Sequence, residues 1–100
     1  MKEYVVEFAP EAIEDLKRLY DWIADAASPT VALAYVTRIE TFCRGLAFSP
    51  ERGHRRDDIR PGLRILGFER RITVAFTVSA ERVTILRLFY GGRNWEALIE

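Results

Sequence analysis

Residues 50–95 read PERGHRRDDIRPGLRILGFERRITVAFTVSAERVTILRLFYGGRNW, and this stretch decides the fold. It holds three short apolar runs, at 63–68, 72–78 and 83–89. The middle run alternates apolar side chains with small or polar ones, which is typical of a strand with one buried face. Because only a tight turn, residues 79–81, joins the second run to the third, we expect an antiparallel meander here.

The segments before this stretch predict one strand and two helices. Residues 4–8 alternate as a strand, and Pro10 suits the first turn of a helix of about 16 residues. A break at Ser28-Pro29, where Ser28 or Thr30 can cap the next helix, separates it from a second amphipathic helix. Since so few residues join the two helices, they should form an antiparallel hairpin.

The whole chain, residues 1–100, is predicted to form one α+β domain with the element order β-α-α-β-β-β. Its length and its 49% apolar composition suffice for one modest core. Residues 50–62 read as a loop because proline, glycine and charged residues dominate them. The helical hairpin should pack on one face of an antiparallel sheet, and residues 4–8 should join its edge.

Each predicted helix shows one apolar face at a spacing of 3.6 residues. The first face consists of Ile13, Leu16, Leu19, Tyr20, Ile23 and Ala27. The second consists of Ala32, Tyr35, Val36, Ile39, Phe42, Cys43 and Leu46. Cys43, the single cysteine, therefore reads as a buried apolar filler. Trp22 and Leu33 lie off both faces, and we expect these exposed apolar groups to contact a partner.

The neutral net charge hides a strong asymmetry along the chain. Residues 1–43 carry eight acidic and four basic side chains, whereas residues 44–71 carry eight arginines and four acidic side chains. Thirteen of the fifteen cations are arginine, which suits bidentate recognition of carboxylate or phosphate. The basic segment predicts an acidic partner, either a protein or a nucleic acid. Alternatively, its central charges pair among themselves on a solvated loop, namely Arg55, Arg56, Asp57 and Asp58.

The sequence offers little for acid–base, metal or cofactor chemistry. One histidine, one cysteine and scattered carboxylates show no metal-ligand spacing, so we expect no metal site. Gly91-Gly92 lacks the rest of a phosphate-binding fingerprint, and we expect no cofactor. No helix–turn–helix pattern suggests sequence-specific DNA binding. We see no secretion signal and no apolar run near the ~20 residues that span a bilayer, so we expect a cytoplasmic protein without membrane contact.

The order of the elements and several motifs together resemble the RelE/ParE toxins of type II toxin–antitoxin systems, and the ParE branch in particular. The motifs are Ser28-Pro29-x-x-Ala32, Ile39, Leu46-Ala47-x-x-Pro50-x-x-Gly53, Pro61-Gly62-Leu63-Arg64, Arg71, residues 83–88 and Gly92-Arg93-Asn94-Trp95. The resemblance covers nearly the whole chain. It implies a toxin that inhibits DNA gyrase without chemistry of its own and is neutralised by a cognate antitoxin that wraps it.

The resemblance also implies an alternative, because RelE-like members cleave mRNA on the ribosome. Many ParE-like sequences have histidine where this chain has Tyr90, and the tyrosine favours the nuclease alternative slightly. In that reading Arg64, Arg71 and Arg87 would hold the phosphate and Tyr90 would assist proton transfer. Strand alternation places Arg87 and Tyr90 on opposite faces unless the strand bulges or ends between them. A third reading is an inactive member of the family.

In the gyrase-binding reading no residue is catalytic. The residues that we expect to bind the target or the antitoxin are Trp22, Leu33, Arg56, Arg60, Arg64, Arg71, Arg87 and Arg93. Arg64 and Arg87 have a structural alternative, in which each emerges on the uncovered sheet face and pairs with nearby carboxylates. Such a surface pair stabilises a protein by at most ~1 kcal/mol. Arg93, with Asn94 and Trp95, could instead cap the sheet.

Overall fold

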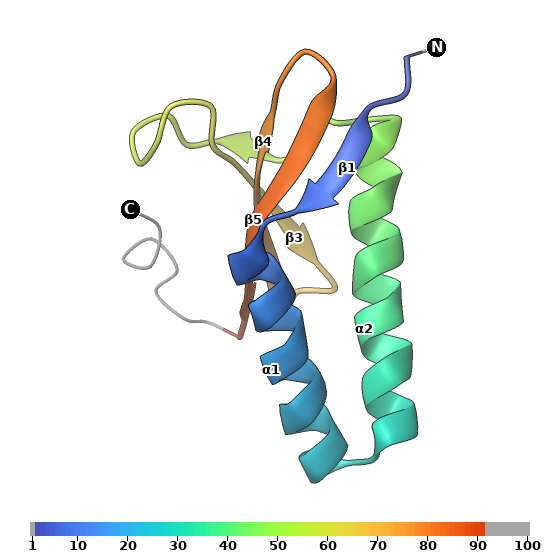
Figure 1. Cartoon of the computed structure of the whole chain (residues 1–100). Helices are drawn as coiled ribbons and strands as arrows, with labels where there is room; N and C mark the ends of the chain where they lie inside the picture. The colour runs from blue at the N-terminus through green and yellow to red at the C-terminus, as the bar shows by residue number, and fades with distance from the viewer. Residues whose placement is uncertain (1, 92–100) are drawn as a thin grey trace.

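A computed structural model describes residues 2–91 (Figure 1). The elements in chain order are β1 (Val5–Phe8), α1 (Pro10–Ala26), α2 (Pro29–Arg44), the 3-10 helix η1 (Gly45–Ala47), β2 (His54–Arg55), β3 (Arg64–Phe68), β4 (Ile72–Val78) and β5 (Arg82–Tyr90). Figure 1 shows α1 and α2 side by side as a hairpin, with the sheet beside them. The α+β class and the helical hairpin are therefore confirmed.

The sheet has the strand order β1-β5-β4-β3-β2. Strands β3, β4 and β5 form the predicted antiparallel meander, and β1 joins its edge. The expectation of a wholly antiparallel sheet is wrong, because β1 pairs with β5 in parallel, from Val5 opposite Arg82 to Phe8 opposite Ile85. The 50–62 segment is not entirely a loop either, since β2 adds a short antiparallel pairing to β3.

The helix ends follow from local chemistry. A proline occupies the first turn of each helix, where its missing N–H costs no hydrogen bond. The Ser28 hydroxyl accepts a hydrogen bond from the backbone N–H of Val31 at 3.1 Å, so Ser28 is the N-cap of α2. The Ala27 N–H donates to the carbonyl of Ile23 as α1 ends. These features limit the connection to a few residues and produce the antiparallel hairpin.

The main core lies between the helical hairpin and one face of the sheet. Its buried members are Ala12, Leu16, Leu19, Val36, Ile39, Cys43, Leu46, Ile72, Val74, Phe76, Val83, Ile85 and Leu88. The predicted face of α2 is confirmed, but that of α1 is rotated, because Ala12 is buried and Ile13 is 49% exposed. Burial raises the pKa of the Cys43 thiol to about 12, as expected for an inert filler.

The opposite face of the sheet is also partly covered. Leu63, Ala75 and Phe89 form a second buried cluster there, and Ile59 packs against it from the 56–62 loop. The expectation that this face would be uncovered is wrong in this region. Arg64 also lies on the helix-facing side, since Leu66 and Phe68 of the same strand alternate with it and join the main core.

A β-bulge in β5 changes which side chains face the helices. Ala75 pairs with Arg87 and Phe76 with Ile85, so Leu86 is the extra residue. As a result Ile85 and Leu88 both belong to the main core, so simple alternation fails at Leu86. Arg87 and Tyr90 still lie on opposite faces, as alternation predicted. Tyr90 packs on the helix side, whereas the Arg87 guanidinium lies 4.9 Å from the ring of Phe89.

The carboxylate of Asp15 connects α1 to the bulged half of β5. Strand β1 pairs with β5 only as far as Ile85, which would leave the Leu88 N–H without a strand partner. Asp15 Oδ2 accepts this N–H at 2.9 Å and Arg87 Nε at 2.8 Å, while Oδ1 accepts Arg87 Nη2 at 3.0 Å. The Asp15 and Arg87 side chains are only 9% and 24% exposed, and the hydrogen bond to Asp15 raises the pKa of Arg87.

Replacement of Asp15 by alanine should lower the free energy of unfolding by about 3 kcal/mol, because it leaves a half-buried guanidinium and a strand N–H without this acceptor. Urea denaturation followed by circular dichroism measures the change. Glu14→Ala is the matched control, since the exposed Glu14 carboxylate lies 3.8 Å from the ammonium of Lys17 and should contribute less than about 0.5 kcal/mol. Equal unfolding midpoints for the two variants would contradict this role.

Gly53 permits the close approach of the Arg-rich segment to β3. Its φ of 78° lies in the left-handed region, and a Cβ atom at this position would overlap the carbonyl oxygen of Ile65. Gly62 has a similar φ of 80°, but within residues 2–91 no atom beyond its own chain neighbours lies within 4 Å of the position that a Cβ would take. Both glycines thus adopt a positive φ that disfavours other residues, but only at Gly53 would a side chain also collide with β3.

Gly62→Ala should therefore cost about 1 kcal/mol of stability for the backbone conformation alone. Gly53→Ala should cost clearly more and should open the pairing of β2 with β3. Hydrogen exchange of the β2 and β3 amides, together with urea denaturation, tests both effects. The same loss of stability in both variants, with β2–β3 protection retained, would show that the close approach does not constrain this segment.

Candidate functional site

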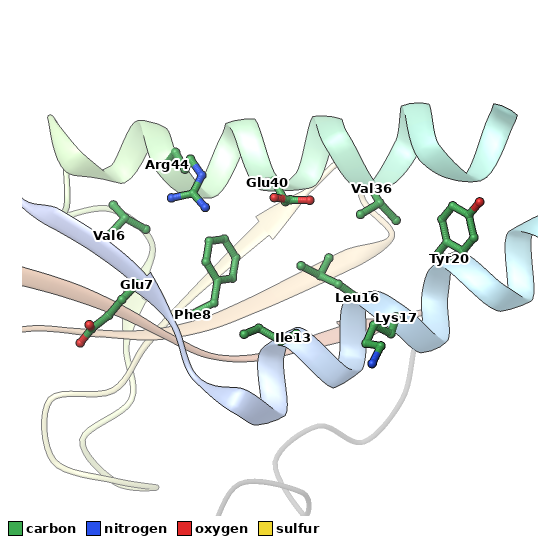
Figure 2. A pocket seen from close by; sticks show the side chains of 10 residues that line it. All are labelled: Val6, Glu7, Phe8, Ile13, Leu16, Lys17, Tyr20, Val36, Glu40 and Arg44. Carbon is green, nitrogen blue, oxygen red and sulfur yellow. The ribbon is translucent and has the colours of Figure 1, made fainter. Parts of the chain in front are cut away.

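An open apolar groove lies between β1, α1 and α2 (Figure 2). Its volume is about 540 Å³, and the lining residues are Val6, Glu7, Phe8, Ile13, Leu16, Lys17, Tyr20, Val36, Glu40 and Arg44. The groove exists because the chain leaves the sheet at Ala9, whose N–H donates to the Ile85 carbonyl at 2.8 Å, and turns directly into α1. The rotation of α1 that buries Ala12 presents Ile13 to this groove.

The charged residues of the groove differ in their partners. Glu7 Oε2 accepts a hydrogen bond from Arg82 Nη1 at 3.0 Å, outside the groove. The guanidinium of Arg44 lies over the ring of Phe8, 5.2 Å from its centroid. Glu40 is partly buried and projects from α2 into the groove, one helical turn before Arg44. The groove thus combines an apolar floor with charges of both signs, which suits binding of an amphipathic segment.

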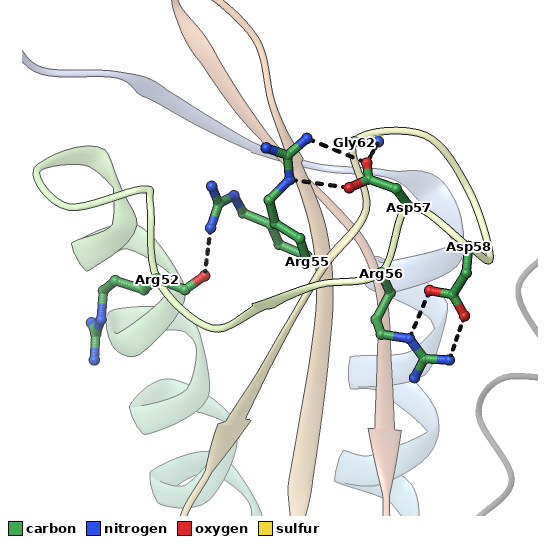
Figure 3. Close-up of polar contacts among 7 residues, drawn as sticks. Arg52, Arg55, Arg56, Asp57, Asp58 and Gly62 are labelled. Carbon is green, nitrogen blue, oxygen red and sulfur yellow. Dashed lines mark hydrogen bonds and ion pairs between the residues drawn. The ribbon is translucent and has the colours of Figure 1, made fainter.

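Two arginines of the 50–62 loop are paired with carboxylates of the same loop (Figure 3). Arg55 Nε lies 3.2 Å from Asp57, and Arg56 makes two hydrogen bonds of 2.9 Å to Asp58. Asp57 Oδ1 also accepts the Gly62 N–H at 2.8 Å. The Gly62 N–H and Arg55 lower the pKa of Asp57, and Arg56 lowers that of Asp58. The internal pairing considered for this loop is therefore confirmed.

Arg71 and Tyr90 meet at the end of the sheet near the helix connection. Arg71 Nη1 donates to the Tyr90 hydroxyl at 3.2 Å, which raises the pKa of Arg71. The ring of Trp22 lies 5.0 Å from that of Tyr90, so the exposed tryptophan extends this cluster. These three side chains form a small aromatic and cationic surface.

Two residues of the β3–β4 turn beside this surface adopt a backbone conformation that is unfavourable for residues other than glycine. Glu69 and Arg70 have φ values of 50° and 63°, in the left-handed region that favours glycine. Arg38 of α2 anchors the turn through hydrogen bonds to both carboxylate oxygens of Glu69. The Tyr35 hydroxyl is buried nearby and has no hydrogen-bond partner within residues 2–91, and burial together with Glu69 raises its pKa.

The four residues of the nuclease alternative are not gathered into one site. Arg64 lies opposite Phe76 at one end of the sheet and donates to the Arg52 carbonyl at 3.4 Å, whereas Tyr90 lies opposite Ile72 at the other end. Arg87 is bound to Asp15 of α1. Arg71 and Tyr90 are in contact with each other.

The other residues predicted to bind a partner are spread over the surface. Trp22 and Leu33 are 54% and 61% exposed, as their positions off the helix faces predicted. Arg60 is exposed in the loop, while Arg56 is paired with Asp58. Arg93, with its suggested capping role, lies outside the described residues. Their roles in binding stay predictions.

The groove itself was missed from the sequence. The spacing of the first helix places Ile13 in the core, and the sequence counts Arg44 only within the basic segment and assigns no site role to Glu40. Their spacing of four residues places them on one side of the helix, but no sequence signal shows that this side meets β1.

The part of the chain that the structure describes contains neither a candidate metal site nor a helix that could span a membrane. Residues 2–91 contain no group of three or more histidine, cysteine, aspartate or glutamate side chains that could hold a metal ion. In the same residues, no helix has the length and apolar character needed to cross a membrane.

Comparison with known proteins agrees with this architecture. The model of the ParE toxin of type II toxin–antitoxin systems matches residues 6–95. Toxin ParE3 of Caulobacter vibrioides is 34% identical over 83 residues, which are 83% of this chain and 82% of that protein.

Two solved structures share the fold. A chain of the chromosomal ParDE toxin–antitoxin system of P. aeruginosa superposes with a TM-score of 0.77 at 27% identity, covering 89% of this chain and 97% of that one. A chain of the RelBE2 toxin–antitoxin complex of Mycobacterium tuberculosis has a TM-score of 0.61 at 20% identity, with coverages of 88% and 98%. The match along nearly the whole chain places it in a family: it belongs to the ParE toxins of type II toxin–antitoxin systems.

Proposed function

We propose that the chain inhibits DNA gyrase by binding it, without catalysing a reaction, and that a cognate antitoxin neutralises it. Its membership of the ParE toxins supports this proposal, because the resemblance noted from the sequence implies gyrase as the target. Gyrase acts on DNA in the cytoplasm, so we propose a cytoplasmic location. An antitoxin partner is supported by the two solved structures of similar fold, because both are of toxin–antitoxin systems.

The observation that carries the non-catalytic proposal is the separation of the candidate catalytic groups. General acid–base cleavage needs a proton acceptor, a proton donor and cations within hydrogen-bonding reach of one phosphate. Arg64 and Tyr90 lie at opposite ends of the sheet, and Asp15 binds Arg87. The single histidine, His54, is exposed on β2 at the Arg64 end.

One contact favours the alternative of a ribosome-dependent mRNA endonuclease. The Arg71 guanidinium donates to the Tyr90 hydroxyl, and the Trp22 ring lies beside it. A cation of this kind could stabilise charge on a phosphate, and an aromatic ring could stack on a base. The endonuclease alternative therefore predicts that the Tyr90 hydroxyl is required for toxicity.

The purified chain, freed from its antitoxin, should block supercoiling of relaxed plasmid by gyrase at near-stoichiometric amounts. In parallel, ribosomes programmed with mRNA should yield no cleavage product. Tyr90→Phe should leave gyrase inhibition unchanged, because a binding surface loses only one hydrogen bond from Arg71. Tyr4→Phe, which removes a hydroxyl from the N-terminal segment, is the matched control.

Full supercoiling activity at a large excess of the chain would reject the gyrase proposal. Ribosome-dependent cleavage that disappears in Tyr90→Phe and persists in Tyr4→Phe would establish the endonuclease instead. If neither activity is found and expression does not slow bacterial growth, the chain is an inactive member of the family.

A further inference from the structure

We propose that the chain contacts its target through the surface formed by Arg18, Trp22, Arg71 and Tyr90, called the Trp22 surface below, and that this surface binds an acidic segment of the target protein. The inference rests on the proposed function and deepens it, because it names the residues that meet the target and the chemistry that they recognise. The segment should place an apolar side chain against Trp22 and carboxylates against the two arginines.

A small apolar depression forms part of the Trp22 surface. Its volume is about 200 Å³, and the residues that line it include Leu19, Leu88 and Phe89, each at most 9% exposed. The Trp22 side chain is 54% exposed, and its ring centroid lies 5.0 Å from that of Tyr90. Tryptophan and tyrosine are enriched among the residues that dominate binding at protein interfaces. Tyr90 contributes its ring, so loss of its hydroxyl alone should not weaken binding.

The two arginines of the Trp22 surface have no acidic partner on the chain. Within residues 2–91, neither Arg18 nor Arg71 forms an ion pair, and Arg71 donates instead to the neutral hydroxyl of Tyr90 at 3.2 Å. The arginines that do bind a carboxylate are Arg38, Arg55, Arg56, Arg82 and Arg87. Cations that lack a carboxylate beside an exposed aromatic ring attract acidic groups of a partner.

The backbone fixes the position of Arg71. Its N–H donates to the Phe68 carbonyl at 3.2 Å across the β3–β4 turn, and its carbonyl accepts the Gly91 N–H at 2.8 Å. Because both peptide groups of Arg71 are hydrogen-bonded, only its side chain has to be ordered when a partner binds. A surface that is already ordered loses less conformational entropy on association.

The turn that precedes Arg71 is strained. Glu69 and Arg70 have φ values of 50° and 63°, and Arg38 holds the turn by hydrogen bonds to both carboxylate oxygens of Glu69. Strain of this kind persists only where surrounding contacts impose it, and it is concentrated at functional sites. Arg38 is therefore a positioning residue for Arg71.

The Trp22 surface and the apolar groove lie on opposite sides of α1. Arg18 and Trp22 are one helical turn apart on one side, whereas Ile13 and Lys17, which line the groove, are one turn apart on the other. A short segment that fills the groove therefore leaves the Trp22 surface uncovered. The target can meet this surface whatever occupies the groove.

A protein segment fits the Trp22 surface better than a nucleic acid does. Asp21 and Asp25 are exposed on α1 within one turn of Trp22, and their carboxylates repel a chain of phosphates. A base stacked on the Trp22 ring would also leave the apolar depression empty. A protein can fill the depression with one apolar side chain and place single carboxylates away from the two aspartates.

Binding of the purified chain to gyrase, together with growth of bacteria that express the chain, tests the inference. Trp22→Ala should weaken gyrase binding by more than about 10-fold, as for an interface anchor, and Trp22→Phe should retain most of it. Arg18→Glu and Arg71→Glu should each weaken binding by about 10-fold, because like charges oppose association. Lys2→Glu makes a similar change of charge at an exposed position of the N-terminal segment and should bind as the parent does.

The positioning role of Arg38 has its own test. Arg38→Ala should weaken gyrase binding several-fold, and Arg70→Gly in the same chain should restore part of it, because glycine adopts a positive φ without an anchor. Arg70→Gly alone should raise the unfolding midpoint in urea. Parental gyrase binding by Arg38→Ala would overturn this role.

Three results would overturn the Trp22 surface as the contact with a target protein. The first is parental gyrase binding and parental toxicity of both Trp22→Ala and Arg71→Glu. The second is loss of antitoxin affinity in these variants while they remain toxic, because the antitoxin is then the occupant. The third is binding of the parent to labelled DNA without gyrase that Arg71→Glu abolishes, because the partner is then a nucleic acid. If Trp22→Ala or Arg71→Glu unfolds, the exposed Arg18→Glu decides.

Toxicity separates this inference from the proposed function. If the parent arrests growth without binding gyrase, gyrase is rejected as the target. Loss of toxicity in Trp22→Ala and Arg71→Glu, with toxicity retained in Lys2→Glu, then still supports the Trp22 surface. If the parent and these variants inhibit gyrase equally, the proposed function stands and the inference fails. A parent that neither arrests growth nor binds gyrase rejects both.

Discussion

The contact between Asp15 and β5 determines how the helices sit on the sheet. Strand β1 supplies a hydrogen-bonding partner to β5 only as far as Ile85, and the bulge at Leu86 follows at once. Beyond the bulge the Asp15 carboxylate replaces β1 as the hydrogen-bonding partner of β5. It accepts the Leu88 N–H and binds the Arg87 guanidinium. The chain can therefore leave the sheet after Phe8 and form α1 without a buried unpaired N–H, and this departure opens the groove beside β1.

The distribution of arginine partners shapes what the surface can bind. Arg55 and Arg56 are paired with carboxylates of their own loop, Arg38 with Glu69, and Arg87 with Asp15. Only Arg55 and Arg56 of these four arginines belong to residues 44–71, and Glu69 of that segment is bound by Arg38 from outside it. The segment therefore keeps its excess of basic charge in the folded chain, as an acidic partner requires.

Sequence patterns predicted the structure correctly where it depends only on residues that are close together in the chain. The helix break with Ser28 as one of two candidate caps, the apolar face of α2 and the strand at β4 were predicted correctly, because each depends on residues close together in the chain. Ile13 was assigned wrongly, because its spacing fits the apolar stripe equally well before the helix is rotated against the sheet. The simple alternation in β5 failed at Leu86, where an inserted residue reverses the side on which the later side chains lie.

The sequence alone determined the class of fold, the two helices, the meander and the family, since periodicity, capping residues and the order of motifs are local properties of the chain. Only the tertiary structure decided the parallel pairing of β1, the binding of Arg87 by Asp15 and the meeting of Arg71 with Tyr90. It also decided that Glu40 and Arg44 face an open apolar groove. These features join residues far apart in the chain, and their geometry depends on how the helical hairpin is rotated against a twisted, bulged sheet, which no local pattern encodes.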